Sequence, residues 1–168
     1  DEEVSRGLGD VYKRQLICNE FGSTKNLTLE EVKSPEPGAG QVLIDVHAAG
    51  INFPDILTVQ GKYQFKPSLP FTPGIEVSGV IKKVGKDVKM RKVGDEVIST
   101  LQTGAFASEV VTSENSTFLK GNMSFEQAAG FALTYGTSYY ALKQRARLVA
   151  GETVLVLGAA GGVGVATI

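Results

Sequence analysis

Cysteine and histidine are almost absent from this chain of 168 residues, and tryptophan is missing altogether. Cys18 is the only cysteine and His47 the only histidine. A lone cysteine cannot form a disulfide within the chain, and one thiol with one imidazole cannot supply a cluster of zinc ligands. A reducing, cytoplasmic compartment is therefore expected.

The chain also lacks an excess of one charge and any long hydrophobic run. Its 17 basic residues balance 18 acidic ones, and no block of like charges indicates a nucleic-acid surface. Apolar runs of about 18 residues, as a membrane-spanning helix needs, do not occur, and the N-terminus has no apolar signal core. We expect neither a nucleic acid nor a membrane among the partners.

Glycine, in contrast, is abundant, and its 20 residues fall between short apolar runs. Residues 41–50 alternate, which places Val42, Ile44, Val46 and Ala48 on one face of a half-buried strand. Three more strand-like runs follow at close spacing, in residues 76–85, 94–100 and 106–113. Short strands joined by such turns predict a small barrel or sandwich.

The pattern changes to helix at Ser124. Ser124 and Gln127 have the spacing of a capping box, in which the two side chains satisfy N–H groups at a helix start. The helix is expected to be interrupted near Gly130 or Gly136. It should run towards the basic residues 143–147, whose charges suit a helix C-terminus.

A continuous apolar run, "TVLVL", stands at residues 153–157 and predicts a strand buried on both faces of a parallel sheet. It opens into the glycine-rich stretch "GAAGGVGVATI", where backbone N–H groups at a helix start can bind a pyrophosphate. The G-x-G-x-x-G frame fits with alanine in first place. The residues predicted to bind the cofactor here are Ala159, Gly161, Gly162, Val163 and Gly164. The alternative is a close strand-to-helix turn without a ligand.

Together these pieces resemble the zinc-independent quinone oxidoreductase branch of the medium-chain dehydrogenase/reductase superfamily. The resemblance is carried by "AAGINFPDILTVQGKY", "LPFTPGIEVSGVIKKVG", "VGDEV", "SFEQAAGFALTYGTSYYAL" and "VLVLGAAGGVG". It implies a mixed α and β fold, in which a GroES-like β-barrel catalytic domain is followed by the first β-strand and glycine-rich loop of a Rossmann α/β domain.

The same resemblance implies a domain organisation. We expect residues 16–123 to form the GroES-like barrel, 124–150 a connecting helical segment, and 151–168 the truncated start of a Rossmann NAD(P)-binding domain. Residues 1–15 have neither a helical nor a strand period and are expected to be a non-native or disordered leader. Members of the family are longer, so the chain looks like an N-terminal fragment of a parent that is expected to be a homodimer.

The resemblance further implies a site without zinc. In the zinc-dependent alcohol dehydrogenase branch, a cysteine stands where this chain has Asn52 and a histidine where it has Ile75. Isoleucine has no lone pair for a metal ion, and a catalytic zinc typically has three protein ligands. Without a Lewis acid, hydride transfer to a quinone or an α,β-unsaturated carbonyl is the expected reaction. The expected cofactor is NADPH; NADH stays possible because the residue that separates the two is expected beyond Ile168.

Three side chains are candidates for this site. Asn52 is expected to donate from its amide to a substrate carbonyl or to contact the nicotinamide; the alternative is a hydrogen bond to its own turn. Tyr63 resembles a tyrosine at the mouth of the family's active site, where its phenol would assist catalysis, or it is a surface aromatic residue. Thr137 matches a threonine near the nicotinamide, or it bonds back to a carbonyl one turn earlier.

Structural roles are expected for Asp55, in ordering its loop, and for Glu76, in a salt bridge or hydrogen bond. Two other functions stay open. They are an enoyl-thioester reductase of the acyl-CoA type and a non-catalytic, crystallin-like NADPH-binding protein. For the 168 residues alone, we expect neither NADPH binding nor turnover, because residues 153–157 would be exposed apolar surface.

Overall fold

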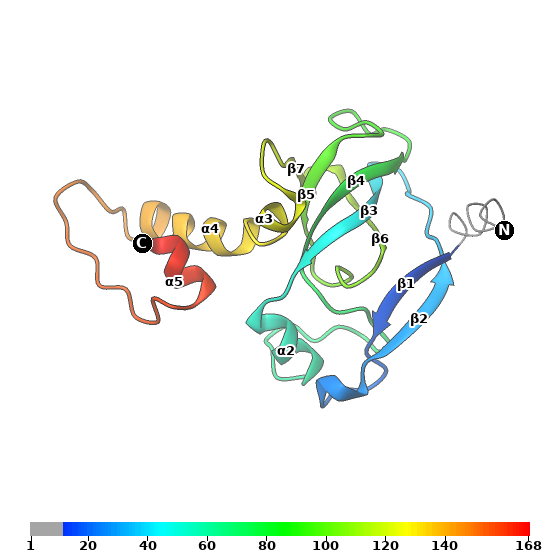
Figure 1. Ribbon diagram of the computed structural model, residues 1–168, viewed down its shortest axis with the longest axis horizontal. Coiled ribbons are helices and arrows are strands. Elements are labelled where there is room, and N and C mark those ends of the chain that lie inside the picture. Colours follow the sequence, from blue (N-terminus) through cyan, green and yellow to red (C-terminus); the bar gives the residue numbers. More distant parts are fainter. Residues whose placement is uncertain (1–11) are drawn as a thin grey trace.

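The computed structural model describes residues 12–168. It shows two small antiparallel sheets with a helical lobe extending to one side and a separate short helix below the larger sheet (Figure 1). Strands β1 (Tyr12–Ile17) and β2 (Thr28–Lys33) form an antiparallel pair. A second sheet of five strands has the order β6-β3-β4-β5-β7. Its strands are β3 (Gln41–Gly50), β4 (Glu76–Val84), β5 (Glu96–Thr100), β6 (Glu109–Ser113) and β7 (Thr117–Leu119). The predicted mixed class with short strands is confirmed.

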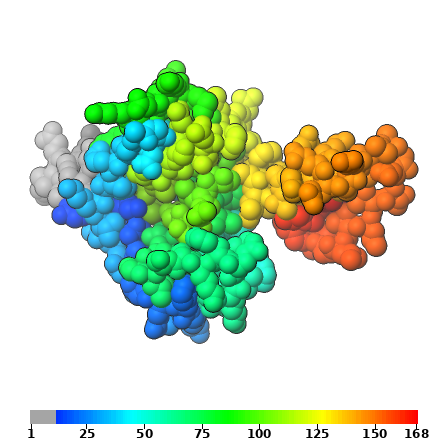
Figure 2. All heavy atoms as spheres, turned by 180° about the vertical axis from the view of Figure 1, so that it is seen from behind, coloured from blue at the N-terminus to red at the C-terminus, as the bar shows by residue number. Residues whose placement is uncertain are grey.

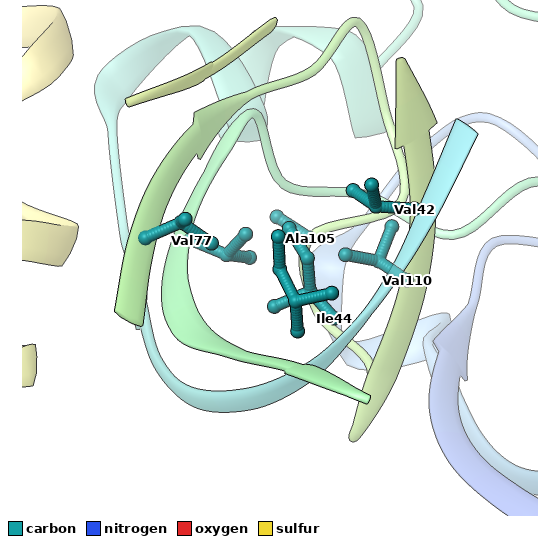
Figure 3. Packing of buried hydrophobic residues seen from close by; sticks show 7 residues of the cluster. Val42, Ile44, Val77, Ala105 and Val110 are labelled. Carbon is teal, nitrogen blue, oxygen red and sulfur yellow. The ribbon is translucent and has the colours of Figure 1, made fainter. Parts of the chain in front are cut away.

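The larger sheet curls around one hydrophobic core (Figure 3). Seven buried side chains fill it, namely Val42, Ile44, Val77, Ile81, Val97, Ala105 and Val110. A fully buried Val or Ile contributes about 1.5 to 3 kcal/mol relative to an exposed one. A smaller cluster contains Cys18, which is buried, and burial raises the pKa of its thiol.

In the first half of β3, Val42 and Ile44 face the core as predicted, but Leu43 on the opposite face is also buried, so this half of the strand is not half-buried. In the second half the predicted alternation is shifted. The pairing of β3 with β4 changes register between Val46 and Ala48. A bulge of this kind reverses the side-chain parity beyond it. Ala49 therefore packs against the core, where the alternation placed Ala48. The bulge thus sets the direction in which the end of β3 presents its side chains.

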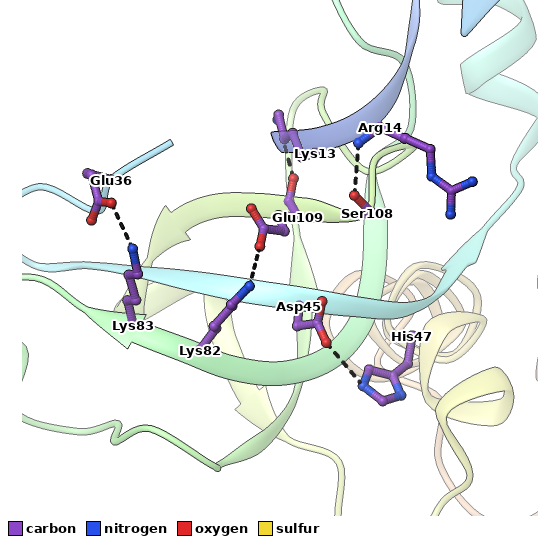
Figure 4. Close-up of polar contacts among 9 residues, drawn as sticks. All are labelled: Lys13, Arg14, Glu36, Asp45, His47, Lys82, Lys83, Ser108 and Glu109. Carbon is purple, nitrogen blue, oxygen red and sulfur yellow. Dashed lines mark hydrogen bonds and ion pairs between the residues drawn. The ribbon is translucent and has the colours of Figure 1, made fainter. Parts of the chain in front are cut away.

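Polar contacts fasten β1 to the edge of the larger sheet (Figure 4). The buried carboxylate of Glu109 on β6 lies 2.9 Å from Lys82 Nζ on β4. The backbone carbonyl oxygen of Glu109 accepts a hydrogen bond of 3.3 Å from Lys13 Nζ. Burial lowers the pKa of the Lys13 amine. The Arg14 backbone N–H donates to Ser108 Oγ at 3.0 Å. The β1–β2 pair is therefore part of the folded unit.

These contacts correct the expected boundary of the leader. Tyr12 pairs with Lys33 and Gln15 with Glu30, so residues 12–15 belong to β1. Local periodicity could not reveal this strand, because its partner lies farther along the chain. Residues 1–11, the rest of the expected leader, lie outside the described residues.

Helix α2 (Phe53–Val59) begins directly after β3, with Asn52 as its N-cap residue. The Asn52 backbone N–H donates to Asp55 Oδ2 at 2.8 Å, as in a capping box. Asp55 is only 3% exposed, and its Oδ1 finds no hydrogen-bond partner among the described residues. Burial raises the pKa of Asp55 to about 6; the Asn52 N–H opposes the rise, and the nearby Glu76 carboxylate adds to it. Asp55 orders this loop, as expected.

Helix α3 (Phe125–Ala129) starts at the predicted capping box. The Gln127 N–H donates to Ser124 Oγ at 3.2 Å, and the Ser124 N–H donates to Gln127 Oε1 at 3.0 Å. The helix ends at Gly130, one of the two predicted interruptions.

Helix α4 (Ala132–Tyr139) follows and continues through Gly136, the other predicted interruption. A wider π-helical segment, η3 (Tyr140–Arg145), extends it and carries Lys143 and Arg145 in its last turn. The expected basic helix end is confirmed.

The C-terminal segment departs from the predicted strand. Residues 153–157 form no strand, and Leu155 and Leu157 are 83% and 84% exposed. A parallel strand needs hydrogen-bonding neighbours, and within residues 12–168 no strand pairs with this segment. The short helix α5 (Gly162–Thr167) follows and lies against α4 (Figure 1). Figure 2 shows this segment, in orange and red, as a lobe beside the barrel. The expected exposure of the apolar run is confirmed.

The buried Asp55 carboxyl predicts a pH dependence of stability. Its pKa of about 6 in the folded protein lies above the ordinary value of 3.8. The folded state therefore holds a proton that the unfolded state has released, and stability falls as pH rises from about 4 to about 6. Asp55→Asn keeps an oxygen that can accept from Asn52 but carries no charge. We expect the variant to gain on the order of 2 to 3 kcal/mol over the parent between pH 4 and pH 7 in urea unfolding.

Asp87→Asn, at an exposed turn, is the matched control and should show no such gain. A difference between Asp55→Asn and the parent that is the same at both pH values would contradict the prediction.

Candidate functional site

A cleft of about 520 Å³ opens where the end of β3 meets the helical lobe. Among its lining residues are five that the sequence predicts for the site, namely Asn52, Tyr63, Thr137, Gly162 and Val163. They come from the N-cap of α2, the loop after α2, the middle of α4 and the first turn of α5. The fold thus brings together side chains that are far apart in the sequence.

The carboxylate of Glu76 connects the two walls of this cleft. Glu76 begins β4 and is 1% exposed. Its Oε1 accepts a hydrogen bond of 2.8 Å from Asn52 Nδ2, and its Oε2 accepts one of 3.0 Å from the Leu133 backbone N–H in the first turn of α4. Hydrogen bonds to charged groups contribute about 1.5 to 3 kcal/mol each. The expected structural hydrogen bond of Glu76 is confirmed, and it fixes both the Asn52 side chain and the start of α4.

Gly50, the last residue of β3, leaves room for this carboxylate. A Cβ atom added at Gly50 would lie 2.5 Å from Glu76 Oε1 and 2.5 Å from the Ala129 carbonyl oxygen. Atoms at that separation overlap, so a larger residue here would push apart β3, β4 and the end of α3. A glycine at this position is therefore a condition for the Glu76 contacts.

The chemistry of Glu76 also determines the orientation of the Asn52 amide. An ionised carboxylate only accepts hydrogen bonds, so the amide nitrogen of Asn52 must face it. One N–H of the amide is then engaged, and the second N–H stays available. The Asn52 backbone is held independently by Asp55 Oδ2 at 2.8 Å. A donor fixed at two points lines the cleft and can orient a carbonyl oxygen.

Tyr63 and Thr137 contribute two hydroxyl groups to the same cleft. Tyr63 follows α2 after a short turn, in which its backbone N–H donates to the Leu57 carbonyl oxygen at 3.2 Å. In α4, Thr134 and Ser138 make hydrogen bonds back to the preceding turn: Thr134 Oγ1 donates to the Gly130 carbonyl oxygen at 2.7 Å, and Ser138 Oγ donates to the Thr134 carbonyl oxygen at 3.0 Å. The Thr137 hydroxyl bonds to none of the residues that the structure describes.

Only part of the predicted glycine loop reaches the cleft. Gly162 and Val163, in the first turn of α5, line it. Two hydrogen bonds fasten α5 to α4: Ser138 Oγ donates to the Val163 carbonyl oxygen at 2.9 Å, and Thr167 Oγ1 lies 3.0 Å from Ser138 Oγ. The other predicted loop residues do not line the cleft: Ala159, Gly161 and Gly164.

The loop glycines allow close packing around α5. A Cβ atom on Gly162 would lie 2.9 Å from Thr134 Cγ2, and one on Gly164 would lie 2.3 Å from the Gly158 carbonyl oxygen. The first N–H groups of a helix have no partner within that helix. The absence of side chains at this turn therefore brings free backbone donors to the wall of the cleft, which suits a phosphate or an amide ligand.

Metal-ligating side chains do not gather at this cleft. Among residues 12–168, no group of three or more His, Cys, Asp or Glu side chains could hold a metal ion. The side chain of His47 is 42% exposed, and its Nε2 lies 3.7 Å from Asp45 Oδ2 (Figure 4). Within the same residues, every helix is too short or too polar to cross a membrane.

Two residues of the α4 wall of the cleft were not predicted. Leu133 and Thr134 line it beside Thr137. The capping box at Ser124 indicates where the helical segment starts, but the hydrogen bond of Glu76 to Leu133 joins residues 57 positions apart. No local pattern in the sequence predicts a contact between residues so far apart along the chain.

Comparison with known proteins agrees with this architecture. Residues 38–156 match the alcohol dehydrogenase GroES-like domain. The chain is 45% identical over 158 residues to a quinone oxidoreductase-like protein 2 homolog of Nematostella vectensis, a match that covers 92% of this chain and 43% of that protein.

Two solved structures are similar along nearly the whole chain. The quinone oxidoreductase of Pseudomonas syringae pv. Tomato DC3000 superposes with a TM-score of 0.85 at 34% identity, over 90% of this chain and 47% of that one. The CurK enoyl reductase gives a TM-score of 0.85 at 36% identity, over 92% of this chain and 49% of that one.

The chain spans about half the length of these relatives. The match to the domain family covers most of the residues, and the expected GroES-like fold is confirmed. The chain therefore belongs to the alcohol dehydrogenase GroES-like domain family, among the quinone oxidoreductase-like members of the medium-chain dehydrogenase/reductase superfamily.

Proposed function

We propose that the full-length protein is a reductase that transfers hydride from NADPH to a quinone or an α,β-unsaturated carbonyl without a metal ion. The names of similar proteins support the reaction class, since they include a quinone oxidoreductase and an enoyl reductase. The observation that carries the proposal is the hydrogen bond of 2.8 Å from Asn52 Nδ2 to Glu76 Oε1, which fixes a neutral donor in the cleft.

The residues of the cleft fit one end of a pyridine nucleotide. Gly162 and Val163 present backbone groups at the wall of the cleft, and Thr137 adds a hydroxyl that bonds to none of residues 12–168. We assign these residues to cofactor binding together with Ala159, Gly161 and Gly164, which shape the turn before α5. When bound, NADPH supplies the hydride. The protein supplies the position of the two reactants and the hydrogen bonds.

The catalytic work of the chain is to stabilise negative charge on the substrate oxygen. Hydride arriving at a quinone or enone carbon leaves an oxyanion, and donors already aimed at that oxygen lower the barrier. Asn52 offers the N–H that Glu76 leaves free. Tyr63 offers a phenol that donates a hydrogen bond first and can then release its proton to the oxyanion.

Two positions support chemistry without zinc. Asn52 and Ile75 stand where the zinc-dependent branch has metal ligands, and the Asn52 amide is already engaged with Glu76. A carboxamide N–H stabilises an oxyanion, but it does not generate an alkoxide from an alcohol as a metal does. We therefore infer that the enzyme catalyses hydride transfer in the direction that reduces a conjugated carbonyl.

The second candidate function is reduction of an enoyl thioester. The likeness to the CurK enoyl reductase favours it. The same oxyanion donors would serve a thioester carbonyl. A competition assay between crotonyl-CoA and a free quinone separates the two functions.

The reductase proposal predicts NADPH oxidation that resists metal removal. We expect the full-length protein to oxidise NADPH with 1,4-benzoquinone or an enone at the same rate before and after treatment with a zinc chelator, because hydrogen bonds replace the Lewis acid. Absorbance at the NADPH band measures the rate. Activity that disappears with chelator and returns with zinc would show that the site depends on a metal.

The role of Asn52 predicts a loss of turnover. Asn52→Ser keeps an N-cap oxygen for α2 but cannot place a donor at the substrate. We expect kcat to fall about 10²-fold, the usual result of removing one oxyanion donor. Asn115→Ser, at an exposed residue outside the cleft, is the matched control. Equal kcat values for Asn52→Ser and the parent, with normal unfolding curves, would remove Asn52 from the catalytic residues.

A further inference from the structure

A second hollow adjoins the cleft. An open groove of about 440 Å³ runs between the β1–β2 pair and the larger sheet. Six apolar residues line most of it, namely Leu16, Leu29, Ala49, Ile51, Phe106 and Ala107. Ile51 lines both the groove and the cleft that contains Asn52. The two hollows therefore adjoin at this side chain.

Main-chain hydrogen bonds preform the groove. The Leu16 N–H donates to the Phe106 carbonyl oxygen at 2.9 Å, and Gln15 forms an isolated antiparallel bridge with Ala107. Phe106 and Ala49 also pack against the hydrophobic core. The backbone at the base of the groove is thus already ordered by the β-structure. Binding of a ligand would therefore cost little conformational entropy in these residues.

Two apolar side chains at this groove are exposed to solvent. Leu29 is 66% exposed and Ile51 is 81% exposed. Single exposed apolar side chains are common, but several around one concave surface next to a candidate active site are typical of a ligand-binding surface. An apolar ligand would remove both side chains from water.

The far end of the groove is polar. Arg14 and Ser108 line the groove and also a neighbouring cavity, whose other walls include Glu31, Asp45 and Glu109. An apolar chain that enters from the cleft past Ile51 therefore meets charged groups beyond Ala107. The groove accepts a chain of limited length.

We propose that this groove binds the apolar tail of the substrate, whose carbonyl head lies at Asn52. The acceptor is then a quinone or enone that carries an alkyl or alkenyl side chain. This inference rests on the proposed reductase function, because it uses the cleft as the site of the head group. Each CH2 of the tail that leaves water raises affinity about fourfold, so the tail sets the preference among acceptors.

The test compares 2-decyl-1,4-benzoquinone with 1,4-benzoquinone as acceptors for the full-length protein with NADPH. We expect kcat/KM to be at least tenfold higher for the decyl compound. Leu29→Ser should lower the ratio of the two kcat/KM values about fivefold. Leu119→Ser, at a leucine of β7 that is 62% exposed and outside both hollows, should leave the ratio unchanged. A ratio near one in the parent, or equal ratios in the parent and Leu29→Ser, would overturn the proposal.

A binding measurement separates failure of the groove from failure of the reductase function. Methyl NMR of the full-length protein with 2-dodecanone, a saturated ketone that cannot take conjugate hydride, should shift the signals of Leu16, Leu29 and Ile51, whereas 2-butanone should not. These shifts without any turnover would reject the reductase function and support the groove. Turnover without these shifts would reject the groove. Oligomers that dissociate on Leu29→Ser would show that a second copy covers the groove, and they would also reject the tail proposal.

Discussion

The carboxylate of Glu76 is the contact on which the site depends. It is buried between the barrel and the first turn of α4, and it accepts hydrogen bonds from the Asn52 amide and the Leu133 backbone. Breaking one side of such a contact would leave a buried charge short of a partner, which costs more than the lost hydrogen bond. The same carboxylate therefore holds the two walls of the cleft together and fixes the direction of the Asn52 amide.

Several features of the chain serve this one contact. The bulge in β3 sets the side-chain parity that leads to Asn52, and Gly50 leaves the space that the carboxylate occupies. Asp55 holds the Asn52 backbone from the other side, at the cost of a buried carboxyl group with a pKa raised to about 6. Destabilising burial of this kind is common where a site must be held rigid. Rigid donors support catalysis because they need no reorganisation when charge develops on the substrate.

The elements with strong local signals could be predicted from the sequence. The reciprocal cap of Ser124 and Gln127 depends on neighbouring residues and is confirmed. The alternation in β3 also depends on neighbouring residues, and it is confirmed only in its first half, where Val42 and Ile44 face the core. Local sequence patterns gave wrong predictions where contacts between distant residues determine the structure. Residues 12–15 need β2 as a partner to form a strand, and the bulge places Ala49 against the core. Among the described residues, the apolar run at 153–157 has no neighbouring strand to pair with.

For the site, the family resemblance pointed to Asn52, Tyr63 and Thr137, and the fold places all three around one cleft. We propose that these residues assist a hydride transfer as neutral hydrogen-bond donors. X-ray diffraction of crystals of the full-length protein, recorded on both sides of the zinc absorption edge, tests that account most directly. It predicts no anomalous peak beside Asn52, with the amide nitrogen on Glu76. A fully occupied zinc ion in contact with Asn52 or Glu76 would contradict it.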